Sequence, residues 1–150
     1  MRKTIVYIGN CEDEGALFER AIEVTVKRSN FLPLDYSNWS LNLLKKSQPF
    51  WYEAIVVDLA NLSSEGIHLL KEIRSIEHLM HVPVVVYTDA TTLGDLLTIK
   101  ACGASHYLPK PVKMEELIRM FNALGKKELI PFIPNYKKQE PVPQRLSYAS

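Results

Sequence analysis

The chain has 150 residues, about the length of one domain, and is 47% hydrophobic and 23% charged, which is typical of a globular protein rather than a disordered or fibrous one. No apolar run approaches the roughly 20 residues of a membrane span, and the short apolar stretch at the N-terminus has no signal-peptide cleavage site after it. Two cysteines, Cys11 and Cys102, form neither a CxxC motif nor a disulfide framework. We therefore expect a cytoplasmic protein with reduced thiols.

Charge is unevenly distributed along the chain. Residues 1–125 carry 13 basic and 15 acidic side chains, a net charge of −2, whereas residues 126–150 carry 5 and 2, a net charge of +3. The second segment also holds 4 of the 9 prolines. This division predicts a folded domain over residues 1–125 and a basic, proline-containing C-terminal tail over residues 126–150. The tail has too few basic residues for a nucleic-acid-binding arm, and its apolar residues predict that it lies partly against the domain.

Short β-branched runs alternate with longer helical patterns over the first 125 residues. The predicted strands are Thr4–Gly9, Phe31–Tyr36, Ala54–Leu59, Val82–Thr88 and Ser105–Leu108. Apolar residues at helical spacing follow each strand in turn: Leu17 and Ala21, Leu41 and Leu44, Ile67 and Leu70, Leu93 and Leu96, and finally Met114, Leu117, Ile118 and Phe121. Gly125 is placed to end the last helix.

Two of the predicted strands contain continuous apolar runs, Ile55–Val57 and Val84–Val86. Such runs indicate strands that are covered on both faces, as in a parallel sheet. Five strand–helix pairs predict an open, doubly wound α/β sandwich. In this fold, functional sites lie at the carboxyl ends of the strands, near the reversal of strand order. The polar or small residues at those ends are Gly9, Asn10, Asp58, Thr88 and Lys110.

Three segments with these residues occur in a recognisable order. The first ends a strand with Asp58 and continues to Gly66, the second is Val82-Pro-Val-Val-Val-Tyr-Thr88, and the third is Gly103-Ala-Ser-His-Tyr107-Leu-Pro-Lys110-Pro111. Together they resemble the receiver domain of bacterial response regulators, over roughly residues 3–125. The resemblance implies a flavodoxin-like fold, in which a five-stranded parallel sheet of order 2-1-3-4-5 carries helices on both faces.

The resemblance also implies a role for individual residues. Asp58 is then the phosphoacceptor, a nucleophile that forms an acyl phosphate, and Thr88 and Lys110 contact the phosphoryl oxygens. Transfer of a phosphoryl group depends mainly on positioning and charge neutralisation. Tyr107 matches the aromatic switch residue of the family, although a strand aromatic that packs against a helix explains it equally well. The Lys110–Pro111 peptide bond is predicted to be cis.

The first strand departs from the family pattern. Members that use Mg²⁺ carry two adjacent acids there, where this chain has Gly9 and Asn10. Mg²⁺ prefers oxygen ligands in near-octahedral geometry, and only Asp58, the Asn10 amide and the Ala60 carbonyl remain to supply them. We therefore expect Mg²⁺ to bind weakly or not at all. We also expect Asp58 and Lys110 to neutralise each other, which makes the empty pocket charge-balanced.

Other acids lie close to these positions. Glu12, Asp13 and Glu14 follow the first strand and either turn into the pocket or form the acidic first turn of a helix, where the helix dipole favours them. The expected helix register favours the second alternative, in which all three stay outside the pocket. Asp89 either narrows access to the pocket or is an exposed loop residue, and we expect the latter.

The remaining chemically notable residues favour structural explanations. Cys11 is expected to be a partly buried, inert thiol and Cys102 a small buried residue. His78 and His81 have no third zinc ligand in the sequence pattern. The aromatic residues around the second helix are expected to pack in the core and at its rim more than to form an exposed docking patch: Trp39, Phe50, Trp51 and Tyr52.

Two functions fit this pattern. The first is a stand-alone receiver domain in a two-component phosphorelay, which takes a phosphoryl group from a histidine kinase or phosphotransfer protein at Asp58 and signals by protein–protein contact. In this family the fourth helix, fifth strand and fifth helix commonly form the partner surface. The second is a pseudo-receiver, a phosphorylation-independent binding module.

An independent enzyme has little support, since no glycine-rich phosphate loop follows the first strand. At most, the chain would phosphorylate and dephosphorylate itself at Asp58. We expect no nucleic-acid or membrane partner, and a monomer or weak homodimer.

Overall fold

The computed structural model of the chain describes residues 3–9, 12–25, 29–48, 51–60, 63–90 and 92–125. Asn10, Cys11, Phe50 and the predicted tail over residues 126–150 lie outside the described residues, so what the sequence predicts for them stays a prediction. The side chains of Glu12 and Asp13 also lie outside the description.

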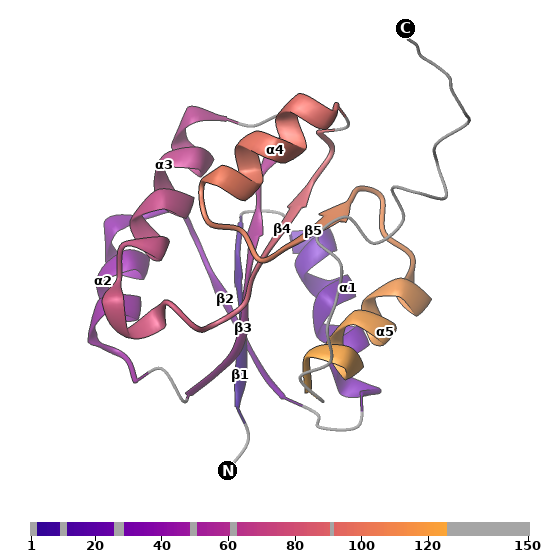
Figure 1. The fold of residues 1–150 in the computed structure, drawn as a ribbon. Helices are drawn as coiled ribbons and strands as arrows, with labels where there is room; N and C mark the ends of the chain where they lie inside the picture. Colours follow the sequence, from indigo (N-terminus) through magenta and orange to yellow (C-terminus); the bar gives the residue numbers. More distant parts are fainter. Residues whose placement is uncertain are drawn as a thin grey trace, which may run out of the picture.

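Five parallel strands form a single sheet (Figure 1). In chain order they are β1 (Thr4–Ile8), β2 (Asn30–Leu34), β3 (Tyr52–Asp58), β4 (Val84–Thr88) and β5 (His106–Pro109). Their order across the sheet is β2-β1-β3-β4-β5, which confirms the predicted flavodoxin-like topology. Every residue of β3 and β4 is buried, and this explains why both strands contain continuous apolar runs without alternation.

Helices cover both faces of the sheet (Figure 1). The helices α1 (Glu12–Glu23) and α5 (Met114–Gly125) pack on one face, and α2 (Asn38–Lys46), α3 (Ser64–Arg74) and α4 (Leu93–Ala101) pack on the other. A 3₁₀ turn, η3 (Glu77–Leu79), precedes β4. Alternate residues of the central strands therefore enter two separate hydrophobic cores. Among the described residues, no helix is long and apolar enough to cross a membrane.

The predicted strand ends differ from the observed ones by at most two residues. The strand β2 ends at Leu34 and not at Tyr36, because Asp35 begins the cap of the next helix. Asp35 Oδ1 accepts hydrogen bonds from the Ser37 amide at 3.1 Å and the Ser40 hydroxyl at 2.9 Å, and Ser37 is the N-cap of α2. A side chain that serves a helix cap takes the backbone out of the strand.

Gly66 allows α3 to begin close to the end of β3. A Cβ atom at this position would lie 1.9 Å from Cδ1 of Leu59, a fully buried side chain. The Gly66 amide donates a hydrogen bond to Oγ of Ser63, the N-cap of α3, at 3.1 Å. Position 66 therefore needs glycine because the Leu59 side chain fills the space of a Cβ atom. The close packing brings the first turn of α3 next to the residues that follow Asp58.

Candidate functional site

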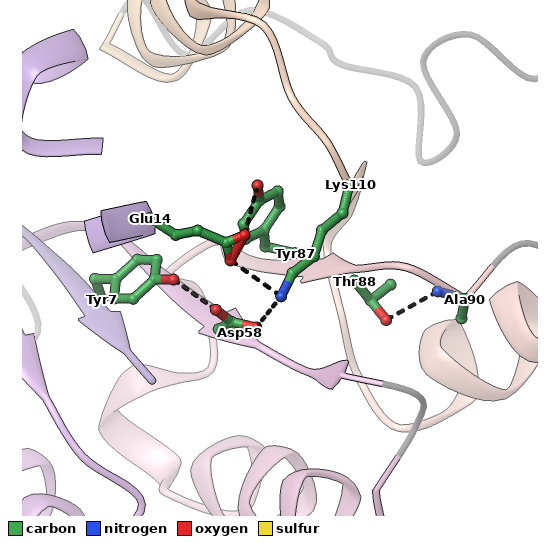
Figure 2. Close-up of polar contacts among 7 residues, drawn as sticks. All are labelled: Tyr7, Glu14, Asp58, Tyr87, Thr88, Ala90 and Lys110. Carbon is green, nitrogen blue, oxygen red and sulfur yellow. Dashed lines mark hydrogen bonds and ion pairs between the residues drawn. The ribbon is translucent and has the colours of Figure 1, made fainter. Parts of the chain in front are cut away.

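Asp58 lies at the carboxyl edge of the sheet, where it ends the middle strand β3. Its relative exposure is only 5%. Both carboxylate oxygens accept short hydrogen bonds: Oδ1 from Lys110 Nζ and Oδ2 from the Tyr7 hydroxyl, each at 2.6 Å (Figure 2). The contact between Asp58 and Lys110 is the one expected from the sequence. The Lys110–Pro111 peptide bond is cis, as predicted.

A second carboxylate enters this pocket from α1. Glu14 Oε1 lies 3.1 Å from Lys110 Nζ, and Glu14 Oε2 accepts a hydrogen bond from the Tyr87 hydroxyl at 3.3 Å. The prediction that the three acids of the first helical turn stay outside the pocket is therefore wrong for Glu14. The physical reason is the helix register, since Glu14 lies four residues before the fully buried Phe18 and so on the face that points at the sheet.

The pocket is not charge-balanced in the way that the sequence suggested. Its described charged groups are two carboxylates, Asp58 and Glu14, and one ammonium group, that of Lys110. Burial lowers the pKa of Lys110, but the hydrogen bonds and negative charges of Asp58 and Glu14 raise it, and the result lies above its ordinary value. Lys110 therefore stays protonated at neutral pH and supplies a fixed positive charge.

Tyr87 holds both Glu14 and Lys110 in place. Its ring centroid lies 4.9 Å from Lys110 Nζ, which adds a cation–π contact to the ion pairs. Burial, and next the charge of Glu14, raise the pKa of Tyr87 to about 12. The phenol is therefore protonated at neutral pH and acts as the donor to Glu14. Neither Tyr87 nor Tyr7 was among the site residues predicted from the sequence.

Tyr7 reaches Asp58 from β1 because position 9 has no side chain. Tyr7 and Gly9 lie on the same face of the strand, two residues apart. A Cβ atom on Gly9 would lie 2.8 Å from Asp58 Cβ and 3.1 Å from Tyr7 Cε1. The space that a side chain at position 9 would need is therefore taken by Tyr7 and Asp58. At position 9, where the resemblance would place an acid, this chain has no side chain, and the Tyr7 phenol lies against Asp58.

Thr88 and Tyr107 are linked through Ala90. Thr88 ends β4 and is fully buried, and its Oγ1 accepts a hydrogen bond from the Ala90 amide at 3.2 Å (Figure 2). The Tyr107 hydroxyl donates to the Ala90 carbonyl at 2.5 Å. Burial, and then the nearby charge of Asp89, raise the pKa of Tyr107, so its hydroxyl is protonated. These bonds connect the end of β4, the segment that leads to α4, and β5.

The described side chains do not fit a divalent cation at this edge. Both oxygens of Asp58 are engaged by Tyr7 and Lys110, Glu14 faces the same ammonium group, and Gly9 offers no ligand. The Ala60 carbonyl, a predicted ligand, accepts a hydrogen bond from the Ser63 amide at 3.1 Å. Over the part of the chain that the structure describes, no group of three His, Cys, Asp or Glu side chains is placed to hold a metal.

Other predicted candidates lie away from this pocket or play structural roles. Asp89 is exposed, as expected. Cys102 is half-buried and packs against the larger core, whereas full burial was expected. His78 Nε2 lies 3.2 Å from the Leu44 carbonyl oxygen, a contact that ties η3 to the end of α2.

The aromatic residues around α2 lie at opposite ends of the strands. Trp39 lies in the first turn of α2, after the carboxyl end of β2, whereas Trp51 directly precedes the amino end of β3. Both are exposed, so they do not pack in the core and only the rim part of the expectation can apply to them, while Tyr52 is buried. The buried stripe of α2 is formed by other residues: Ser40, Leu41 and Leu44.

Comparison with known proteins agrees with this fold. The family model for the response regulator receiver domain matches residues 11–122. Transcriptional regulatory protein BasR of Escherichia coli (strain K12) is 35% identical over 86 residues, which cover 53% of this chain and 38% of that protein. Response regulator MprA of Mycobacterium sp. (strain KMS) is 26% identical over 116 residues, which cover 71% of this chain and 46% of that protein. The chain thus spans less than half the length of these relatives.

Solved structures are similar in fold at low sequence identity. Chemotaxis response regulator CheY4 of Vibrio cholerae matches with a TM-score of 0.69 and 16% identity, covering 83% of this chain and 99% of that one. The receiver domain of sensor histidine kinase PA1611 from Pseudomonas aeruginosa PAO1 matches with a TM-score of 0.67 and 21% identity, with the same coverage. That second structure has a magnesium ion coordinated in its active site cleft.

Proposed function

Because this chain belongs to the response regulator receiver domain family of two-component signalling, we propose that Asp58 is its phosphoacceptor. The observation that carries the proposal is the position of Asp58 at the end of the middle strand, with the Lys110 ammonium 2.6 Å from Oδ1. Asp58 pairs in register with Tyr87, so that Thr88 lies one residue further along the neighbouring strand. The donor is a phosphohistidine, carried by a histidine kinase or a phosphotransfer protein.

The chemistry follows from these groups. A carboxylate oxygen of Asp58 attacks the phosphorus in line with its bond to the donor nitrogen, and the nitrogen leaves with the electron pair of that bond. Lys110 neutralises negative charge on the phosphoryl oxygens, and Thr88 supplies a hydroxyl donor. The product is an acyl phosphate on Asp58. Because the described donor set does not fit a metal, we expect any Mg²⁺ contribution to be weak.

The output is protein–protein contact through the surface of α4, β5 and α5. Leu93 and Leu97 of α4 have relative exposures of 46% and 56%, and exposed apolar side chains of this size suit a partner interface. A rearrangement at Thr88 reaches this surface through Ala90, which bonds to both Thr88 and Tyr107. Tyr107 is the residue that we expect to report the state of the pocket.

The proposal is tested with acetyl phosphate and with beryllofluoride, each with and without Mg²⁺. We expect intact mass to increase by one phosphoryl group with acetyl phosphate, and this adduct to disappear in Asp58→Asn. Resonances of the Tyr107 ring should shift when beryllofluoride binds. If wild-type protein gains no adduct and no Tyr107 resonance moves under any of these conditions, the phosphoacceptor proposal is wrong.

A second candidate is a binding module that works without phosphorylation. It is favoured by one observation, namely that both oxygens of Asp58 are already engaged by protein groups. In this case the Asp58→Asn variant should bind its partner as tightly as the wild type. A partner affinity that depends on the phosphoryl group would exclude this candidate.

A further inference from the structure

We propose that Tyr7 is a positioning residue of the Asp58 pocket, and that its hydroxyl must release the carboxylate before Asp58 can accept a phosphoryl group. The inference rests on the proposed acceptor role of Asp58 and adds a control to it. The contact joins residues on neighbouring strands, β1 and β3, at the edge where the chemistry takes place (Figure 2).

The hydrogen bond between Tyr7 and Asp58 is short and has a charged acceptor. The Tyr7 hydroxyl donates to Asp58 Oδ2 at 2.6 Å, and the acceptor belongs to a carboxylate that is almost fully buried. Hydrogen bonds of this length to a charged acceptor are about twice as strong as neutral ones. Because Lys110 Nζ donates to Oδ1 at the same distance, each oxygen of Asp58 already accepts one short hydrogen bond, and the Tyr7 contact competes with attack by Oδ2.

The contact from Tyr7, and not the one from Lys110, is the contact that breaks during transfer. Lys110 carries the positive charge that the phosphoryl oxygens need, and it can follow them while it remains next to Glu14 and the Tyr87 ring. The Tyr7 phenol carries no such charge, and it covers Oδ2. When Oδ2 forms its bond to phosphorus, the bond from phosphorus to the donor breaks, the leaving group takes that electron pair, and Tyr7 keeps its own proton.

The Tyr7 ring packs against aromatic side chains of α1 and β2. Its centroid lies 4.9 Å from that of Phe18 on α1 and 6.2 Å from that of Phe31 on β2. Its Cε1 atom lies where Gly9 leaves room, and a Cβ on Gly15 of α1 would lie 4.0 Å from the same atom. The hydroxyl therefore releases Asp58 through a shift of the ring against α1, and not by a rotation of the O–H bond alone, since the oxygen itself lies in front of Oδ2.

The test removes the hydroxyl and keeps the ring. We expect Tyr7→Phe to react with acetyl phosphate about tenfold faster than the wild type, because one hydrogen bond to a charged group no longer has to break. The matched control is Tyr52→Phe, which removes another buried phenol, at the amino end of β3 away from the pocket. Its rate should equal that of the wild type. If Tyr7→Phe reacts at the wild-type rate or more slowly, Tyr7 does not restrain Asp58 and the proposal is wrong.

A spectroscopic readout separates this proposal from the acceptor role itself. The ¹³C carboxyl resonance of Asp58, assigned with Asp58→Asn, should shift in Tyr7→Phe and stay in place in Tyr52→Phe. An unchanged resonance in Tyr7→Phe would overturn the positioning role. If no variant gains an adduct while the resonance moves as expected, the acceptor role of Asp58 fails and the restraint on transfer fails with it, and the contact with Tyr7 then only positions the carboxylate.

Discussion

Lys110 is the residue on which the charge of the pocket depends. Its ammonium lies 2.6 Å from Asp58 and 3.1 Å from Glu14, so its removal leaves two carboxylates close together in a mostly buried space. Breaking a buried ion pair by removing one partner is costly, because the other charge keeps its desolvation penalty without the attraction that offset it. The same ammonium is the group that we expect to meet an incoming phosphoryl oxygen.

We therefore predict that Lys110→Met lowers the free energy of unfolding by about 3 kcal/mol, measured by urea denaturation at neutral pH. Adding Asp58→Asn should recover part of this loss, since the buried charge is then gone. Lys113→Met is the control, because Lys113 is exposed and surface substitutions usually change stability by less than about 0.5 kcal/mol. Equal effects of the two lysine substitutions would contradict the prediction.

Restoring an acid at position 9 should not restore a metal site. A Cβ there would lie 2.8 Å from Asp58 Cβ, so Gly9→Asp must displace Asp58, Tyr7 or the strand, at a cost of about 1–3 kcal/mol. We expect calorimetry to show no sub-millimolar Mg²⁺ binding for the wild type or for this variant. Gly15→Ala is the control, because its added Cβ would meet Tyr7 Cε1 at an ordinary 4.0 Å. Tight Mg²⁺ binding that Asp58→Ala abolishes would refute this account.

Single residues of the pocket differ in how well the sequence predicts them. Asp58 and Lys110 follow from strand ends and from the family resemblance. Glu14 could have been assigned from its spacing to Phe18, since a four-residue spacing places both on one helix face. Tyr7 lies beyond such patterns, because its contact joins residues 51 positions apart and depends on the absence of a side chain at Gly9.

At the scale of elements, Arg74 connects the end of α3 to the segment that enters β5. Its guanidinium donates to the Gly103 carbonyl at 2.6 Å, the Ser105 hydroxyl at 2.8 Å and the Leu79 carbonyl at 3.2 Å. Gly103 has a φ of +105° and lies against the same side chain, where a Cβ would be 2.3 Å from Arg74 Cγ. The turn before β5 thus needs glycine for its backbone and for its packing.

We predict that Gly103→Ala destabilises the protein by about 2 kcal/mol, because alanine rarely adopts a positive φ and its methyl group would displace Arg74. Gly94→Ala is the matched control. Gly94 lies in the first turn of α4, and the nearest atom to an added Cβ would be 4.0 Å away, so the variant should be neutral or more stable by up to about 1 kcal/mol. Thermal unfolding of both variants decides this. A stable Gly103→Ala protein would mean that the turn adapts.

Element types were more predictable than element ends. The continuous apolar runs in β3 and β4 specify strands that are buried on both faces, and this property depends only on local sequence. The end of β2 depends instead on Asp35, whose carboxylate bonds to two serines of the next segment. Whether such a residue extends a strand or caps a helix depends on its hydrogen-bond partners. Hydrophobic periodicity does not reveal those partners.

At the scale of the molecule, the two cores set the geometry of the pocket. Tyr7 of β1 and Tyr87 of β4 belong to the core that α1 and α5 cover, and both rings pack against Phe18 of α1. The opposite core holds Tyr107 with α4. Asp58 is thus tied to one face through Tyr7 and its packing against α1, while Thr88 on the neighbouring strand is tied to the other face through Ala90 and Tyr107. We therefore expect a phosphoryl group that contacts both Asp58 and Thr88 to affect both faces of the sheet.

Several phenols of this molecule should make its stability fall at alkaline pH. Burial, and next the charge of Asp58, raise the pKa of Tyr36 from 10.0 to about 12, and burial and Glu14 raise that of Tyr87 to about 12. The folded state therefore holds these protons more tightly than the unfolded chain does. The stability that they contribute is fully present below pH 10 and is lost as the pH rises from 10 through about 12.

We therefore predict that the free energy of unfolding, measured by urea denaturation at a series of pH values, begins to decline near pH 10 and continues to about pH 12. The raised pKa of Lys110 acts in the same direction. Tyr36→Phe should reduce the slope of this decline, since the variant no longer has the phenol that titrates differently in the two states. A free energy of unfolding that stays constant across this interval would show that these phenols ionise equally in the folded and unfolded chain, so that neither burial nor the neighbouring charges raise their pKa.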